Sequence, residues 1–249
     1  MKGSRTLIYA IVLIVLCGGA GGIWVYRDYH KWLALGPGGL PYNFRGYLTT
    51  TWMRRLKRDP IDTNRFAKAI GTDGDRSYLH ELPKRDGQRP TIAVYPIPHR
   101  QMDQLPDPAM RQKIVAVFND EVSRRSELVH YKLSFYEKRN QAVFLIHAEN
   151  GHVDGKISGG ELGHVHPSDG SMHMIFSASD AKKVIDAGWG ECHPLSGQLN
   201  LPEPYLLIYP PRNDQELAIT ALLLDAAVNH MAMEGVPAPG AGAGSEPAH

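Results

Sequence analysis

The stretch 161–176 constrains the fold more than any other part of the sequence, because it holds three of the 12 histidines within ten positions. His164 and His166 are two residues apart, so on a β-strand their side chains point to the same face. The next segment, 167–170, reads Pro-Ser-Asp-Gly, which is typical of a turn. Residues 171–176 then have the composition of a returning strand. We therefore predict a β-hairpin in this stretch.

The length of the hairpin loop decides where the third histidine, His173, points. A loop of residues 167–170 pairs His164 with His173, whereas a tighter turn at 169–170 pairs His166 with His173. Either even-length loop places all three imidazoles on one face. A three-residue loop would send His173 to the opposite face. We expect an even-length loop and a shared face.

The N-terminal segment 7–26 contains twenty residues without a charge, which is long enough to cross a bilayer as a helix. Basic residues flank it on both sides. We therefore predict one N-terminal transmembrane helix within a membrane anchor over residues 1–30; a cleaved signal peptide is the alternative. The basic cluster at 54–58 follows the span and favours a single-pass membrane protein with a cytosolic catalytic domain.

The remainder of the chain mixes strands and amphipathic helices. The elements we expect are a helix at 108–124, strands at 133–137, 142–147 and 205–209, and a last helix from 214 to about 234. They predict an α+β domain over residues 31–234, with helices packed on one face of an antiparallel β-sheet. The Pro/Ala/Gly-rich tail 235–249 is expected to be disordered.

The charge of the chain gives no reason to expect a nucleic-acid partner. The formal net charge is +1, which provides no electrostatic attraction to nucleic acid. Nothing in the sequence indicates an oligomeric state.

Five motifs together give the chain a family resemblance. They are Asn43-Phe-Arg-Gly-Tyr47, Leu82-Pro-x-x-x-Gly87-x-Arg-Pro90, His164-x-His166 with His173, Gly188-Trp-Gly-x-x-His193-Pro-Leu-x-Gly197, and Pro211-Arg-Asn213-x-x-Glu216. From about Arg27 to Met233, the chain resembles the fungal luciferase family, the small membrane-anchored enzymes of mushroom bioluminescence. The fourth motif is the most specific of the five.

The resemblance implies a reaction and a small-molecule substrate. The expected substrate is a hydroxypyrone of the 3-hydroxyhispidin type, oxidised by O2 through a peroxide intermediate with loss of CO2 and emission of light. The resemblance also implies that no flavin, haem or ATP takes part, so that O2 is a co-substrate and no cofactor is expected.

The chemistry of an electron-rich enol requires a base near neutrality, which a histidine can provide. We expect His164 or His166 to act as the base and His173 to fix its tautomer. Glu161 is a candidate to orient these rings and bind substrate. Its odd spacing from His164 and His166 would place it on the other face of a regular strand.

Three further residues are candidates for the site. Arg212 precedes a helix N-terminus and could stabilise an enolate oxyanion; the alternative is a structural ion pair with Glu216. Trp189 could stack on a planar substrate or pack in the core. His193 could be a second acid or base, or a turn residue.

Two other function classes remain open. His164, His166 and His173 could instead bind Fe or Zn in a metal-dependent enzyme. A cupin-like pattern would need a glutamate a few residues later, where Gly170 or Ser171 stands. The chain could also be a membrane-tethered domain that binds a small molecule without catalysis.

Overall fold

The computed structural model describes residues 2–72, 74–149 and 151–233, with only the helical backbone for residues 2–17. In this part of the chain an antiparallel sheet of six strands has the order β1-β2-β3-β4-β6-β5. The strands are β1 (Val129–Leu133), β2 (Gln141–Leu145), β3 (Glu161–Val165), β4 (Met172–Ile175), β5 (Gly190–Cys192) and β6 (Tyr205–Ile208).

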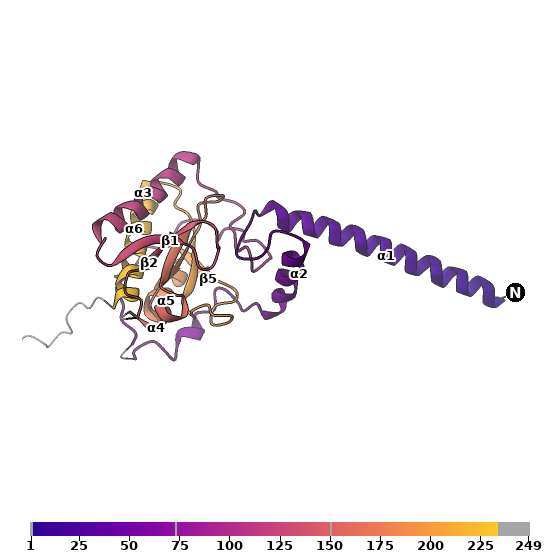
Figure 1. Cartoon of the computed structure of the whole chain (residues 1–249), viewed down its shortest axis with the longest axis horizontal. Coiled ribbons are helices and arrows are strands. Elements are labelled where there is room, and N and C mark those ends of the chain that lie inside the picture. Colours follow the sequence, from indigo (N-terminus) through magenta and orange to yellow (C-terminus); the bar gives the residue numbers. More distant parts are fainter. Residues whose placement is uncertain (1, 73, 150, 234–249) are drawn as a thin grey trace, which may run out of the picture.

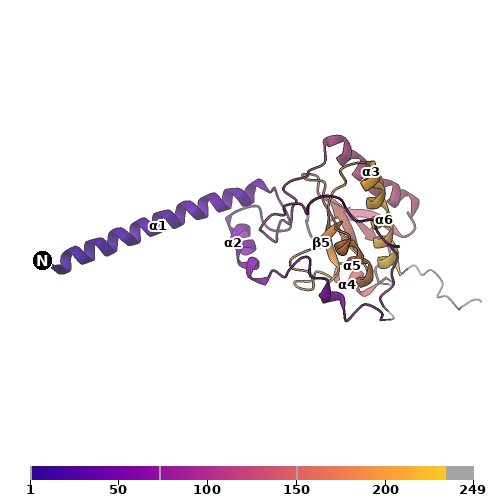
Figure 2. The ribbon, with the colours of Figure 1, turned by 180° about the vertical axis from the view of Figure 1, so that it is seen from behind.

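The described residues form the helices α1 (Lys2–Ala34), α2 (Phe44–Met53), α3 (Pro108–Arg124), α4 (Val153–Ile157), α5 (Ala178–Asp186) and α6 (Asp214–Ala232). Of these, α3, α5 and α6 pack on one face of the sheet and enclose the main core. Two short 3-10 helices, at Arg54–Leu56 and Thr63–Phe66, follow α2. Helices α3 and α6 lie side by side in both views (Figures 1 and 2). Apolar side chains of α3, α5 and α6 share one buried cluster with β4 and β6. The predicted α+β class with an antiparallel sheet is confirmed.

Side-chain caps fix the starts of the two long helices on the sheet. Asp107 accepts a hydrogen bond from the backbone N–H of Met110 at 2.7 Å, and proline occupies the first position of α3. Asn213 accepts one from the backbone N–H of Glu216 at 2.9 Å at the start of α6. Both starts agree with those predicted.

The β3–β4 hairpin has the predicted even-length loop. His164 is paired with His173 across the two strands. The backbone N–H of His166 donates to the carbonyl of Ser171 at 2.8 Å, which closes a loop of residues 167–170. All three histidines therefore share one face of the sheet, opposite the apolar core.

A β-bulge in β3 places Glu161 on that face as well. Val143 of β2 is paired with Gly163, but the adjacent Phe144 is paired with Glu161, so the register skips Leu162. One extra residue in a strand reverses the side to which the preceding side chain points. The expectation that Glu161 lies on the other face is therefore wrong.

The predicted transmembrane helix and single-pass membrane location are also wrong. Among the described residues, no helix combines the length and the apolar character that crossing a bilayer requires. The uncharged run belongs to a helix of 33 residues that continues beyond the expected boundary at residue 30. The later turns of α1 carry charged residues, and Trp32 near its end packs with Leu35, Tyr47 and Tyr95 in a second buried cluster. The tail 235–249, predicted to be disordered, lies outside the described residues.

An irregular segment between α2 and α3 runs across the histidine face of the sheet. It is fixed at Ile97, whose carbonyl accepts a hydrogen bond from the Trp32 Nε1–H at 2.9 Å. It is also fixed at Gln101, whose backbone N–H donates to Asp169 at 2.9 Å. Residues 96–100 are thereby held over the hairpin and form one wall of the site.

Candidate active site

A cavity of about 210 Å³ lies between the histidine face of the sheet and residues 96–100. Its polar lining comes from His99, Arg100, Glu137, His164, His173 and His193, and its apolar lining includes Leu195, Leu199, Leu201 and Tyr205. Sites for small molecules usually enclose about 300–1,000 Å³. At about 210 Å³ this cavity lies below that range, so it suits a compact molecule.

The three predicted histidines form a buried triad beside the cavity. The ring centroids of His164, His166 and His173 lie 5.0–5.3 Å apart. Their exposed fractions are 1%, 0% and 4%. The Nε2 atoms of His164 and His166 are 3.3 Å apart. His164 and His173 line the cavity, and His166 lies behind them.

Each ring of this triad is held through its Nδ1 atom. The distances are 2.6 Å from His164 to Glu161 Oε1, 2.8 Å from His166 to Ser171 Oγ, and 3.0 Å from His173 to the Leu206 carbonyl. Glu161 and the carbonyl are acceptors, and the Ser171 hydroxyl donates its proton to Asp169. These partners assign the proton of each neutral ring to Nδ1 and leave the Nε2 lone pair free.

Glu161 is buried and orients His164 rather than facing the cavity. Its carboxylate also accepts hydrogen bonds from the Ser134 hydroxyl at 3.1 Å and the Phe135 backbone N–H at 2.6 Å. A carboxylate satisfied in this way fixes the ring orientation of its histidine partner.

Burial keeps His166 and His173 neutral. It lowers the pKa of both rings well below the ordinary value, and Arg100 beside His166 and the neighbouring histidines around both rings lower it further. Both rings therefore carry free lone pairs at neutral pH.

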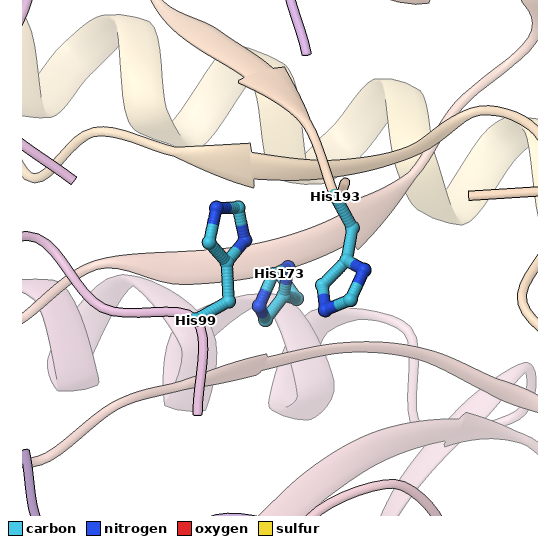
Figure 3. A group of neighbouring side chains, drawn as sticks. All are labelled: His99, His173 and His193. Atoms are coloured by element: carbon cyan, nitrogen blue, oxygen red, sulfur yellow. The ribbon is translucent and has the colours of Figure 1, made fainter. Parts of the chain in front are cut away.

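The segment 96–100 contributes a further histidine, His99, that the sequence analysis did not identify. Figure 3 shows His99 and His193 on either side of His173. The His99 ring centroid lies 5.5 Å from that of His173 and 4.9 Å from that of His193. The Nδ1 atom of His99 is buried and has no hydrogen-bond partner among the described residues. This nitrogen is available to a molecule in the cavity.

A carboxylate supports the other side of the His99 ring. Glu191 Oε1 lies 3.6 Å from His99 Nε2. Burial alone would raise the pKa of Glu191, but donors including His99 and Tyr209, together with the charge of Arg89, bring it below the ordinary value. Burial lowers the pKa of His99, an effect that Glu191 partly opposes. His99 is thus a neutral imidazole backed by an ionised carboxylate.

Arg100 places a buried cation at the same wall. Its guanidinium contacts the Glu137 carboxylate at 2.5 Å, and both side chains are more than nine-tenths buried. Glu137 Oε1 also lies 3.6 Å from His166 Nε2. This ion pair therefore connects the wall formed by residues 96–100 with the triad.

His193 lines the cavity and also stabilises a turn. Its Nδ1 accepts a hydrogen bond from the Leu195 backbone N–H at 3.1 Å. In the neutral ring the proton is therefore on Nε2. Burial lowers the pKa of His193 well below the ordinary value.

Trp189 and Arg212 do not line the cavity. Trp189 packs in the main core and its Nε1–H donates to the Pro83 carbonyl at 2.7 Å. Arg212 donates from Nε to Glu216 at 2.8 Å, and its side chain is 32% exposed. Trp189 therefore packs in the core and Arg212 forms a structural ion pair, which are the alternatives that the sequence left open for these two residues. The candidate roles of Trp189 in stacking on a substrate and of Arg212 in stabilising an oxyanion therefore find no support at this cavity.

Comparison with known proteins identifies the family. A model of the luciferase domain matches residues 159–227, which include the β3–β4 hairpin. The chain is 31% identical to a luciferase of Armillaria gallica over 242 residues, 92% of this chain and 89% of that protein. It is 31% identical to a luciferase of Armillaria mellea over 222 residues, 84% of this chain and 82% of that protein.

A luciferase of Neonothopanus nambi is 28% identical over 221 residues, 83% of this chain and 81% of that protein. No solved structure matches the chain. Because the similarity covers nearly the full length of the chain, this protein belongs to the fungal luciferase family.

Proposed function

We propose that this protein is a luciferase-type oxygenase that oxidises a hydroxypyrone enol with O2 in the histidine cavity, releasing CO2 and light. Two observations support the proposal. The relatives that share most of the chain are luciferases. The cavity combines a buried imidazole that has a free nitrogen with a buried guanidinium.

The first step is removal of the enol proton, and we assign it to His99. Its free Nδ1 accepts the proton, and Glu191 beside Nε2 stabilises the imidazolium that forms. The sequence alone favoured His164 or His166 for this role. The Nε2 atoms of those two rings, however, face one another at 3.3 Å.

The enolate then needs a cation and a dry environment. Arg100 supplies positive charge at the cavity wall, where low polarity strengthens its effect on a developing oxyanion. Tyr205 and Leu195 exclude water from the faces of a planar ring. Arg100 thus takes the role that the sequence analysis gave to Arg212.

The electrons come from the substrate. The enolate transfers them to O2, a carbon–oxygen bond forms, and the resulting peroxide loses CO2. Because the enolate itself is the reductant, this scheme requires neither flavin nor haem.

The observation that carries this proposal is the buried His99 Nδ1 without a partner at the wall of the cavity. The test is to add 3-hydroxyhispidin to the purified protein under air and to record light, O2 uptake and CO2 release. We expect O2 consumption and CO2 formation in equal amounts, accompanied by light. A rise in melting temperature without O2 uptake would instead identify a binding domain.

A further inference from the structure

We propose that His164, His166 and His173 bind a first-row divalent metal ion, such as Zn²⁺ or Fe²⁺, at the wall of the cavity. One ring nitrogen from each histidine lies within 4.8 Å of the other two. Because His164 and His173 line the cavity, the ion would adjoin its contents. The inference concerns metal binding itself and holds whatever the substrate is.

The hydrogen bonds of the triad prepare all three rings as ligands. Each Nδ1 is held by an acceptor, namely Glu161, the Ser171 hydroxyl or the Leu206 carbonyl. Histidines that bind metals characteristically donate their other N–H to a carboxylate, carbonyl or similar group. Three converging Nε2 lone pairs without a cation would repel one another.

The separation of two of these nitrogens matches a shared ion. Nitrogen ligands bind Zn²⁺ at about 2.0–2.1 Å, so two of them on a tetrahedral ion lie about 3.3–3.4 Å apart. The Nε2 atoms of His164 and His166 are 3.3 Å apart.

A second group of histidines beside the cavity, His99 with His173 and His193, is less suitable. Its ring nitrogens also lie within 4.8 Å of one another. The Nδ1 of His193, however, accepts a hydrogen bond from Leu195, so its Nε2 carries the proton and offers no lone pair. This distinction assigns the ion to the triad.

Glu137, in the turn between β1 and β2, is the candidate for a fourth ligand. Its Oε1 lies 3.6 Å from His166 Nε2, but its carboxylate is outside the group of three whose ligand atoms all lie within 4.8 Å of one another. Because carboxylate oxygens bind Zn²⁺ at about 2.0–2.2 Å, Glu137 would have to move toward the ion to bind it. Arg100, which pairs with Glu137, would offset part of its charge.

The experiment measures metal binding without substrate. Chelator-treated protein is titrated with Zn²⁺ or Co²⁺ by calorimetry, and the visible absorption of bound Co²⁺ reports its coordination. We expect one equivalent to bind with the spectrum of a nitrogen-ligated ion and to raise the melting temperature. His166→Ala should abolish this binding.

Two further variants separate ligation from general damage. Ser171→Ala keeps all three ring ligands but removes the Nδ1 acceptor of His166 and a hydroxyl donor to Asp169, and it should weaken binding about 10–100-fold. His152→Ala alters a separate group with Asp154 and His230 and should leave triad binding intact.

The inference is overturned if folded wild-type protein takes up no stoichiometric metal, or if His166→Ala binds as wild type does. Equal losses in His152→Ala and His166→Ala would overturn it too. A failed oxidation assay has no bearing on these results, because the two measurements are independent.

Discussion

At the scale of single residues, the ion pair of Arg100 and Glu137 links stability to the proposed chemistry. Both side chains are buried, so Arg100→Met leaves an unpaired carboxylate and should cost about 3–5 kcal/mol of unfolding free energy. Turnover should also fall about 10²-fold, because the cation facing the enolate is lost. Urea unfolding and O2 uptake measure the two effects.

The double variant Arg100→Met/Glu137→Met is the control for this prediction. Replacing both partners by apolar groups removes the orphaned charge, so most of the lost stability should return. Turnover should not return. Recovery of both properties would show that Arg100 acts only through the fold.

The acidic limb of the pH profile of kcat/KM should follow the protonation of His99, the proposed base. Burial lowers the pKa of His99 below its ordinary value of 6.5, so the neutral base is present at pH 7 and is lost only in more acidic solution. Glu191 raises this pKa by stabilising the imidazolium. Glu191→Gln should therefore move the acidic limb of kcat/KM to lower pH. A limb that stays in place would exclude His99 as its origin.

The sequence identified some site residues and not others for a physical reason. His164, His166 and His173 belong to a regular hairpin, in which strand periodicity determines the direction of each side chain. His99 and Arg100 lie in an irregular segment where no periodicity applies; a polar pair after Pro98 is the only signal. For Arg212 the structural alternative, an ion pair with Glu216 four residues on, describes its position, because this nearby partner holds the guanidinium.

At the scale of elements, the hairpin was predictable and the bulge was not. Turn composition and the two-residue spacing of His164 and His166 were sufficient to predict the shared face. The bulge at Leu162 depends on the pairing of β3 with β2, a long-range contact that composition does not encode. The bulge determines whether the Glu161 side chain points to the face that carries His164 or to the opposite face.

Gly170 is the residue on which the hairpin turn depends. Its φ is +74°, and an added Cβ would lie 2.7 Å from the ring of Pro106. Gly170→Ala should cost about 1–2 kcal/mol of backbone strain and about 1–3 kcal/mol more from overpacking, measured by urea unfolding. Gly71→Ala is the matched control, since φ is +81° with no atom within 4 Å of the added Cβ. An equal loss of unfolding free energy in the two variants would exclude a contribution from the contact with Pro106.

At the scale of the whole molecule, the N-terminal helix is part of the site's construction. Trp32 is 1% exposed, and its indole N–H donates to the carbonyl of Ile97, which itself lines the cavity. Trp32→Ala should cost about 3–5 kcal/mol and lower turnover, because the wall formed by residues 96–100 loses its support. Trp24, 59% exposed on the same helix, is the control, and Trp24→Ala should change stability by less than about 0.5 kcal/mol.

The location of α1 also shows why hydropathy alone misled the prediction for residues 7–26. That prediction was based on the length of the run and its lack of charge. Here the same helix continues into turns that bury Trp32 and bring Asp28 to the hydroxyl groups of Tyr47 and Tyr95. Those contacts depend on tertiary packing that the local sequence does not reveal.

The rate of O2 uptake with 3-hydroxyhispidin, compared between His99→Gln and Arg212→Ala, tests most directly whether oxidation takes place in the histidine cavity. His99→Gln should lower the rate about 10²–10⁴-fold, because the base is lost. Arg212→Ala should keep nearly the wild-type rate, since Arg212 pairs with Glu216 away from the cavity. Loss of O2 uptake in folded Arg212→Ala, with wild-type rates in His99→Gln, would contradict this account.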